Sequence, residues 1–281
     1  MAMEQDRLQK QRFELKYIIP EAKALAIREF VRCYLDLDEY GVGKPNFSYP
    51  VHSLYLDSDQ LALYQTTING DKNRFKLRLR YYTDAEDAPV FFEIKKRTNN
   101  TISKERGAVK RSAVAMILRG HIPDAAHLLS KSPKALVAIQ RFCQHTLDLR
   151  ATPKAHIAYL REAWLPAHDN SVRVTLDREV RCEAEPTFNL STTMIKPVLV
   201  FGNEVVLELK FTNRFPDWFR DLVRVFGLMQ CGAAKYVDGV TLLGKERVTR
   251  EHARPEHETA FLSREGAASR NPTREAVRPF A

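Results

Sequence analysis

Charged and apolar residues alternate one by one in several segments of the chain. In the segment RFELKY, Glu14 and Lys16 fall on one face of an extended chain, and Leu15 and Tyr17 fall on the other. The segments VHSLYLD, RFKLRLRYY, FFEIKKR, AYLRE, SVRVTLDRE and EVVLELKF show the same alternation. Such alternation over about five residues predicts half-buried antiparallel strands. We therefore expect a sheet with one apolar face and one polar, mostly charged face.

Apolar residues at helical spacing lie between these strands. Leu25, Ile27, Phe30 and Val31 follow a helix start at Pro20. Further helical segments are predicted over 58–68, over most of 109–147 with interruptions at Gly and Pro, and from residue 216 onward. Long helical insertions between antiparallel strands argue against a simple meander and favour an α+β fold.

The two ends of the chain differ in composition from the middle. Residues 1–10 are polar, and residues 245–281 are rich in Arg, Glu, Ala and Pro with few apolar residues. Segments of this kind bury too little apolar surface to offset the entropy of ordering. We expect disorder over 1–10 and 245–281, and one folded domain over 11–244.

Cysteine usage and hydropathy bear on the compartment. The cysteines Cys33, Cys143, Cys182 and Cys231 are scattered without a C-x-x-C pair, which suits a reducing compartment better than a disulfide framework. No run of about 18 apolar residues predicts a membrane span, and the first residues do not resemble a signal peptide. We expect a cytoplasmic protein that associates with a membrane only through a partner.

The formal net charge of +9 favours a polyanionic partner. For one amphipathic strand, a solvated outer face is the ordinary explanation. Here, however, the polar faces of several strands are dominated by Arg, Lys and Glu rather than by Thr, Ser and Gln. If the predicted helices cover the apolar faces, the charged faces point toward each other inside a barrel or a deep groove.

Carboxylates accompany the cations on these polar faces, at Glu14, Glu93, Asp177, Glu204 and Glu208. They neutralise part of the positive charge, and the remaining net positive charge attracts a multiply charged anion. Arg and Lys are the usual partners of phosphate oxygens. A carboxylate beside a phosphate is repulsive unless it holds a divalent cation that bridges to the phosphate. The mixture of signs therefore favours metal-assisted phosphate chemistry over simple anion storage.

Familiar nucleotide-binding motifs are absent from the sequence. There is no G-x-x-x-x-G-K-[ST] loop, no protein-kinase loop set and no H-E-x-x-H pattern. Nucleic acid is not expected as a partner, because Phe13, Phe75 and Phe92 fall on the face opposite the charges and could not stack on bases there. Any phosphate chemistry must therefore come from the charged strands themselves.

The motifs RFELKY, YLD, KLRLRYY, FEIKKR, YLR, RVTLDR, LELK and AKY occur in this order along the chain. In this order and spacing, the chain resembles the catalytic polyphosphate polymerase domain of the vacuolar transporter chaperone (VTC) complex, within the triphosphate tunnel metalloenzyme superfamily. The resemblance runs from about residue 11 to residue 244. It implies a closed antiparallel β-barrel tunnel with a charged lumen and helices packed outside.

The same resemblance implies an activity and a cofactor. ATP would bind in the tunnel with a divalent metal, Mn²⁺ or Mg²⁺, and its γ-phosphate would pass to a growing inorganic polyphosphate chain. Glu208 matches the metal-binding glutamate, Tyr159 a tunnel tyrosine near the nucleotide, and Lys104 and Arg106 a basic pair at the tunnel mouth. The expected catalytic residues are Lys16, Arg78, Arg80, Lys95, Arg161, Arg173, Glu208 and Lys235. The expected substrate-binding residues are Lys76, Lys104, Arg106, Tyr159 and Lys210.

Two positions depart from the pattern of related proteins. The closing motif has Ala234 before Lys235 where the family has Ser, which removes one possible hydrogen bond to phosphate. The first motif has Lys16 where related triphosphatases and cyclases carry a second Glu, and this change favours the polymerase branch. The sequence also lacks the phosphate-sensing domain and membrane helices of eukaryotic subunits, so a separate membrane-protein partner could replace them.

Two other functions remain open at this point. A hydrolase of triphosphate or polyphosphate would use the same tunnel with water as the acceptor. A non-catalytic polyanion-binding protein would account for the net charge alone. Among the carboxylates, structural pairing and direct function are equally compatible with Glu14 and Asp177, whereas a structural role is favoured for Glu204.

Overall fold

A computed structural model describes residues 12–249, apart from residues 100, 131 and 170. The segment 1–10 and the residues 250–281, for which the sequence predicts disorder, lie outside this part of the chain. Residues 245–249 are described, and they include a short 3-10 helix over Lys245–Arg247 and the buried side chain of Val248.

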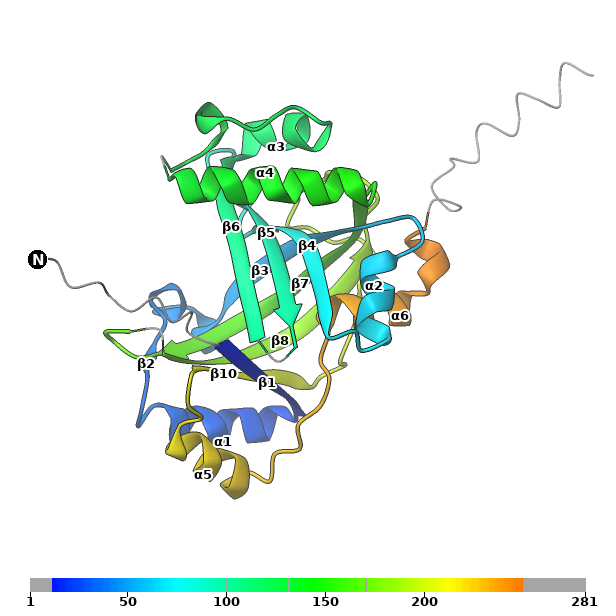
Figure 1. Ribbon diagram of the computed structural model, residues 1–281. Helices are drawn as coiled ribbons and strands as arrows, with labels where there is room; N and C mark the ends of the chain where they lie inside the picture. The colour runs from blue at the N-terminus through cyan, green and yellow to red at the C-terminus, as the bar shows by residue number, and fades with distance from the viewer. Residues whose placement is uncertain (1–11, 100, 131, 170, 250–281) are drawn as a thin grey trace, which may run out of the picture.

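Strands and helices are interleaved along the chain, as the α+β prediction requires (Figure 1). The strands are β1 (Arg12–Ile19), β2 (Asp36–Leu37), β3 (Tyr49–Asp57), β4 (Asn73–Tyr81), β5 (Pro89–Thr98), β6 (Thr101–Lys110), β7 (Thr152–Leu165), β8 (Val172–Ala184), β9 (Val198–Leu199) and β10 (Val205–Thr212). The α-helices are α1 (Glu21–Val31), α2 (Ala62–Ile68), α3 (Arg111–Leu118), α4 (Pro133–Asp148), α5 (Asp217–Val225) and α6 (Lys235–Leu243). The 3-10 helices are η1 (Glu39–Gly41), η2 (Pro45–Phe47), η3 (Ala125–His127) and η4 (Lys245–Arg247).

Every alternating segment of the sequence contributes to a strand, whereas the two-residue strands β2 and β9 and the longer strand β6 were not predicted. β6 is the long one of the three. Its sequence TISKERGAVK has no clean alternation. Lys104, Glu105 and Arg106 are consecutive charged residues, and both faces of this edge strand are partly exposed. A strand that is not half-buried lacks the period-two signal, because no face demands apolar residues.

The strands form one antiparallel sheet, whose main path runs β1-β10-β8-β7-β3-β4-β5-β6. β1 and β6 are the two ends of this path, and no ladder between them closes the sheet within the described residues. The expectation of a closed barrel is therefore wrong. The loop between α5 and α6 takes the place of a partner strand at β1, because the Cys231 amide donates to the Lys16 carbonyl at 3.0 Å. A backbone acceptor used in this way is not available to β6.

The open sheet is nevertheless strongly curved (Figure 1). Lys95 on β5 and Glu14 on β1 are six strands apart in the sheet order, yet the Lys95 Nζ and Glu14 Oε2 atoms lie 3.0 Å apart. In a flat sheet, six steps of about 4.8 Å would separate these strands by about 29 Å. The curvature therefore brings both ends of the sheet around one concave inner face.

Helices cover the convex outer face in two groups (Figure 1). α3 and α4 pack against β4, β5 and β6, where Leu77, Phe92 and Ile139 belong to one buried cluster. α1 and α5 pack against β1, β10 and β8, where Ile27 and Leu207 belong to a second cluster. These contacts account for the apolar positions of the alternating segments, so the charged positions face inward.

Helix α6 departs from the expectation that all helices pack outside. Ile157, Val206 and Cys182, which is directly opposite Ile157 beyond a register shift in β7 and β8, lie on the same face as the inward-facing charges and belong to a third buried cluster with residues of α6. A Cβ atom at Gly239 would lie 2.7 Å from the Cys182 Sγ, so this close contact of helix and sheet requires glycine. α6 therefore sits on the concave face and places its first residue, Lys235, among the inward-facing charges. None of the helices in the described ranges is long and apolar enough to cross a membrane.

Candidate functional site

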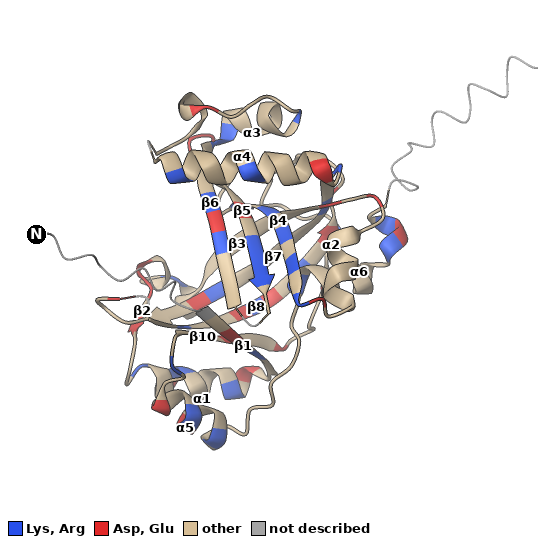
Figure 2. Cartoon of the chain, viewed as in Figure 1, with Lys and Arg blue, Asp and Glu red and all other residues tan. Residues whose placement is uncertain are grey.

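Charged residues are spread over many of the strands that form the curved sheet (Figure 2). Strand register gathers many of them on the concave face, because the pairs Lys16–Glu208, Lys76–Lys95 and Arg78–Glu93 are directly opposite across neighbouring strands. All of the predicted site residues lie on this face or at the start of α6. They are Lys16 (β1), Lys76, Arg78 and Arg80 (β4), Lys95 (β5), Lys104 and Arg106 (β6), Tyr159 and Arg161 (β7), Arg173 (β8), Glu208 and Lys210 (β10), and Lys235 (α6).

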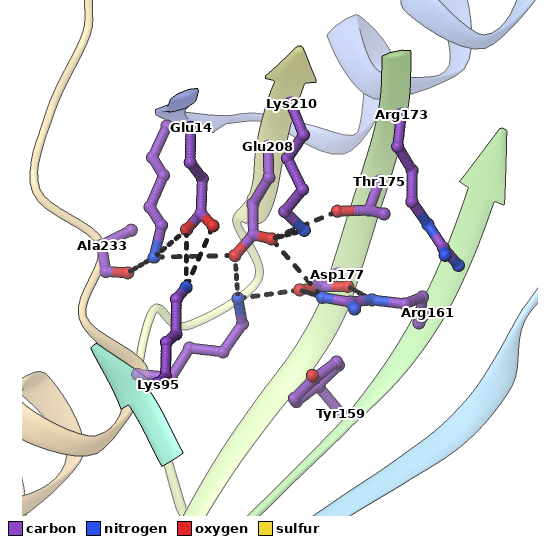
Figure 3. A network of polar contacts seen from close by, with 12 residues as sticks. Glu14, Lys95, Tyr159, Arg161, Arg173, Thr175, Asp177, Glu208, Lys210 and Ala233 are labelled. Carbon is purple, nitrogen blue, oxygen red and sulfur yellow. Dashed lines mark hydrogen bonds and ion pairs between the residues drawn. The ribbon is translucent and has the colours of Figure 1, made fainter. Parts of the chain in front are cut away.

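Glu208 stands at the centre of the largest ion-pair network (Figure 3). Its Oε1 accepts from Lys235 Nζ at 2.9 Å, and its Oε2 accepts from Lys210 Nζ at 2.5 Å. Lys16 and Arg161 add ion pairs at 3.6 and 3.5 Å. Burial would raise the pKa of this carboxyl, but Lys210, Lys235 and the other cations outweigh burial and hold it well below its usual range. Glu208 is therefore a buried carboxylate.

Asp177 fixes two of the cations that surround Glu208 (Figure 3). Its carboxylate accepts two hydrogen bonds of 2.7 Å from the Arg161 guanidinium and lies 2.7 Å from Lys235 Nζ. Burial opposes its charge, but Arg161 and Lys235 lower its pKa. The pKa of Lys235 is in turn raised, because Asp177 and Glu208 outweigh its own burial. Asp177 thus orients Arg161 and Lys235, and both of these cations also contact Glu208.

Glu14 forms a second carboxylate beside Glu208. It accepts from Lys95 Nζ at 3.0 and 3.1 Å, and Lys16 Nζ lies 3.2 Å from it. The same Lys16 ammonium donates to the Ala233 carbonyl at 2.8 Å and lies 3.6 Å from Glu208. Lys16 therefore occupies the point that both carboxylates can reach.

Glu93 organises the basic residues of β4 and β6. The Arg78 Nε donates to it at 2.8 Å, and Lys104, Arg106 and Arg80 lie 3.5, 3.8 and 4.0 Å away. Burial raises the pKa of Glu93, but Arg78 and Arg80 reverse the effect and hold it well below its usual range. One fully buried carboxylate thus lies within ion-pair distance of four cations. Its single negative charge cannot neutralise all four, so net positive charge remains to attract an anion.

Tyr159 lies between the two groups of cations. The Arg80 Nη2 donates to its hydroxyl at 3.1 Å, and Arg161 and Lys235 each lie 5.1 Å from its ring centroid. Cations over an aromatic face are attracted to the ring. The tyrosine therefore holds Arg80, Arg161 and Lys235 around one point of the inner face.

Arg173 depends on a residue that sequence reasoning missed. Its Nη2 donates to Asp38 Oδ2 at 2.6 Å, and Asp38 precedes η1 in a loop rather than in an alternating strand. Asp38 is buried, and the Tyr49 hydroxyl donates to it at 3.4 Å. A lone Asp in a loop carries no periodic signal, so only the fold could place it here.

Three buried donors on the inner face make no hydrogen bond within the described residues. They are Ser53 Oγ, Arg80 Nε and Arg173 Nε. Buried polar groups are almost always satisfied in folded proteins, so each of these donors is suited to an acceptor that the protein itself does not provide. Phosphate oxygens are acceptors of this kind.

Glu204 lies apart from the network. It precedes β10, is exposed, and leaves Val205 as the first residue of the strand. The alternation of the segment EVVLELKF therefore extends one residue too far in the sequence interpretation.

The carboxylates fit a divalent metal only in the company of phosphate. Within the described residues, no group of three His, Cys, Asp or Glu side chains could hold a metal ion by itself. Glu14 and Glu208, however, both reach the Lys16 ammonium, so both could reach one cation near that point. Mg²⁺ is commonly held by one or two carboxylates together with substrate phosphates. The donor set therefore fits a metal that arrives with a triphosphate.

The VTC domain model matches residues 11–244 of this sequence. The chain belongs to the VTC domain family. This membership supports an enzyme of a polyphosphate-related tunnel family, as the resemblance in the sequence implies. Among curated proteins, none matches the chain.

Several solved structures are similar to the VTC domain at low sequence identity. A candidate adenylate cyclase from Bacillus halodurans has a TM-score of 0.44 and 12% identity, covering 80% of this chain and 95% of its own. The PH1819 protein from Pyrococcus horikoshii has a TM-score of 0.41 and 13% identity, covering 83% and 99%. A candidate adenylate cyclase from Vibrio parahaemolyticus has a TM-score of 0.40 and 11% identity, covering 81% and 97%.

Proposed function

We propose that this VTC domain is a polyphosphate polymerase that transfers the γ-phosphate of ATP to the end of a growing polyphosphate chain. The observation that carries the proposal is the Glu208 network. One buried carboxylate contacts cations from β1, β7, β10 and α6 on a concave face where cations outnumber carboxylates. This arrangement combines a metal ligand with several phosphate-binding groups in one place.

The triphosphate of ATP would bind between the two groups of cations. Arg80 on β4 donates to the Tyr159 hydroxyl, and Arg161 and Lys235 lie over the ring of the same tyrosine. Phosphate oxygens would take the hydrogen bonds that Arg80 Nε and Arg173 Nε do not make within the protein. Lys76, Lys95, Lys104, Arg106 and Lys210 would neutralise the remaining negative charge of donor and acceptor.

Glu208, together with Glu14, would hold a divalent cation, Mn²⁺ or Mg²⁺, on the triphosphate. A bound divalent cation supplies Lewis-acid neutralisation of the phosphate oxygens. Lys16 would have to leave the position between the two carboxylates, and the Ala233 carbonyl already offers its ammonium a partner at 2.8 Å. The E-x-K motif would thus contribute one carboxylate and one cation to the same phosphate.

The transfer itself requires positioning and charge stabilisation more than a protein nucleophile. An oxygen of the terminal phosphate of the acceptor forms a bond to the γ-phosphorus, and the bond to the β-γ bridging oxygen breaks, so that ADP leaves. The acceptor oxygen is already ionised, so no general base is needed. Arg161, fixed by Asp177, would stabilise the charge that shifts onto the transferring group.

The decisive experiment incubates the purified protein with ATP and Mn²⁺ and follows both long-chain polyphosphate and free phosphate. The proposal expects long polymer and ADP, with loss of polymer after removal of the metal by a chelator. Free phosphate without polymer would instead identify a hydrolase that uses water as acceptor. Binding of ATP and polyphosphate without any turnover would identify a polyanion-binding protein.

Partners and compartment follow from this proposal. ATP and inorganic polyphosphate are the expected ligands, and nucleic acid is not. The four cysteines are free thiols in the structure, which suits a reducing, cytoplasmic location. A separate membrane-protein partner remains a prediction from the family resemblance.

A further inference from the structure

A cavity lies on the outer face of the sheet, on the side away from the candidate site. His52 on β3 is directly opposite Ala158 on β7, and Ala158 is directly opposite Arg181 on β8. His52 faces outward, because the next residue, Ser53, pairs with the inward-facing Arg80. Neighbouring strands are about 4.8 Å apart, so the backbones at His52 and Arg181 are about 10 Å apart. The small alanine side chain between them leaves a hollow.

Two loops complete the lining of this cavity. Its volume is about 390 Å³, and small-molecule sites occupy roughly 300–1,000 Å³. Pro50, Ala158 and Leu160 supply apolar surface, while Asp84 follows β4 and Thr192 lies between β8 and β9. The Asp84 carboxylate accepts from the Thr192 amide at 2.6 Å and from its hydroxyl at 2.5 Å. The cavity is therefore built from the sheet and from two loops that hold each other.

The hydrogen bonds around His52 fix which of its ring nitrogens carries the proton. The Ser191 carbonyl can only accept, so the Tyr81 hydroxyl donates to it at 3.0 Å. The Tyr81 oxygen then accepts from His156 Nε2 at 3.1 Å, and the same N–H group faces His52 Nδ1 at 3.0 Å. Burial lowers the pKa of both histidines to about 4, so both rings are neutral near pH 7. The neutral His52 ring thus accepts at Nδ1 and carries its proton on Nε2.

This Nε2–H group is a donor without a partner. His52 is only 7% exposed and lines the cavity, but its Nε2 makes no hydrogen bond to any of the described residues. Buried polar groups are almost always satisfied in folded proteins, so this donor is suited to an acceptor on a bound molecule. Arg181 offers further donors, because its only hydrogen bond in the described part of the chain runs from Nη2 to Glu179.

The charges that line the cavity distinguish between classes of ligand. Among the lining side chains, Arg181 is the cation and Asp84 is the carboxylate. Asp84 would repel a simple anion, and Arg181 would repel a simple cation. A zwitterion satisfies both charges at once, and the apolar surface of Pro50 and Leu160 suits an apolar group on the same molecule.

We propose that this cavity binds an α-amino acid with an apolar side chain in its zwitterionic form. The carboxylate of the amino acid accepts from His52 Nε2 and from Arg181. Its ammonium group donates to Asp84, and its side chain lies against Pro50 and Leu160. The site is on the opposite face of the sheet from the candidate phosphate site, so the two sites can be occupied together.

The first experiment needs no variant. Calorimetry on the full chain compares L-leucine with isocaproate, which lacks the ammonium group, and with isoamylamine, which lacks the carboxylate. L-leucine is expected to bind more tightly than either by about tenfold, because loss of one ligand charge leaves a lining charge without its partner. Equal binding of isocaproate or isoamylamine would overturn the recognition of a zwitterion. Absence of binding for L-leucine, L-methionine and L-phenylalanine would overturn the site itself.

Variants then locate the binding in the cavity. Arg181→Gln and Asp84→Asn each remove one lining charge, and each is expected to weaken binding of L-leucine by about tenfold. Arg220→Gln and Asp87→Asn are the matched controls, because they make the same changes at exposed positions outside the lining. Circular dichroism and thermal unfolding establish that all four variants are folded. Affinity for L-leucine that is unchanged in both cavity variants would overturn the proposal.

Competition separates this site from the inner face. Saturating tripolyphosphate should leave the affinity for L-leucine unchanged within about twofold, because ligands on separate sites do not displace each other. Displacement of L-leucine by tripolyphosphate would place the amino acid on the inner face and overturn the assignment. None of these measurements uses turnover, so they decide the amino-acid site whether or not the protein makes polyphosphate.

Discussion

Two regions of the inner face differ in how their charges are balanced. Around Glu208, buried carboxylates are paired with cations at 2.5–3.6 Å, and the side chains hold one another in place. Lys72, Arg74, Lys76 and Arg97 lie on and beside β4 and β5 in a row that we call the cation row, and none of them makes an ion pair within the described residues. Phosphoryl transfer needs fixed groups and a metal ligand, whereas a moving polymer needs positive charge without strong geometric demands. Under the proposed function, the paired region would carry the chemistry, and the cation row would neutralise the charge of the polymer.

The strongest test of the first region is Glu208→Gln, which keeps the shape of the side chain and removes its charge. We expect metal-dependent turnover to fall by roughly 10³-fold, because a lost metal contact removes several kcal/mol of transition-state stabilisation. Turnover should be measured over a range of Mn²⁺ concentrations. Normal turnover at ordinary Mn²⁺ would remove Glu208 from the mechanism.

Asp177→Asn tests whether pairing in this region has a positioning role. Loss of the charge leaves Arg161 and Lys235 without their buried partner, so the free energy of unfolding should fall by about 3 kcal/mol. Because Arg161 also loses its orientation, kcat should fall about 100-fold. Urea unfolding and steady-state kinetics measure the two effects. A stability loss with unchanged kcat would show that Asp177 is only structural.

The cation row predicts a dependence on pH that the Glu208 region does not. Burial and the neighbouring cations Lys16 and Lys95 lower the pKa of Lys76 from 10.5 to about 7, so Lys76 is protonated at pH 6 and mostly neutral at pH 8.5. Polyphosphate affinity should therefore fall by roughly tenfold between these pH values. Lys76→Arg keeps the charge at both values and should flatten the profile. An equally steep profile in the Arg variant would assign the titration to another group.

The same lysine affects stability in a defined direction. Its pKa in the folded protein lies below the value of 10.5 expected for an unperturbed lysine, so the unfolded chain binds more protons between about pH 7 and 10.5. The contribution of Lys76 to the free energy of unfolding therefore rises with pH across this window, and its penalty is fully present below pH 7. Lys76→Met should stabilise the ligand-free protein most at pH 6, as thermal unfolding at several pH values would show.

The sequence predicts the charged residues that lie in strands better than those that lie in loops. Lys16, Arg78 and Glu208 lie in strands with strict alternation, so their common face follows from period two and from burial of the opposite face. Asp38 and Lys72 lie in loops, where no periodic pattern reports which way a side chain points. The open edge of β1 depends on one backbone hydrogen bond from Cys231, and the inward position of α6 depends on the absence of a side chain at Gly239. Such tertiary details leave little trace in hydrophobic periodicity.

Tyr55→Phe gives the smallest expected effect, and it tests how precisely the cations beside Glu93 must be held. The Arg78 Nη1 donates to the Tyr55 hydroxyl at 3.0 Å, while the Tyr55 ring stacks on Tyr236 with centroids 4.8 Å apart. The substitution keeps the stacked ring and removes one hydrogen bond to a charged group. Arg78 retains Glu93, so stability should change by only about 1 kcal/mol.

The KM for ATP is expected to rise about fivefold in the Tyr55→Phe variant, with little change in kcat, because Arg78 keeps its charge and loses part of its orientation. Tyr64→Phe is the matched control, since it removes a buried hydroxyl that contacts Thr241 away from the charged face. An equal rise of KM in both variants would show that the effect comes from general loosening of the fold. A rise confined to Tyr55→Phe would mean that the paired cations must be held in place as well as charged.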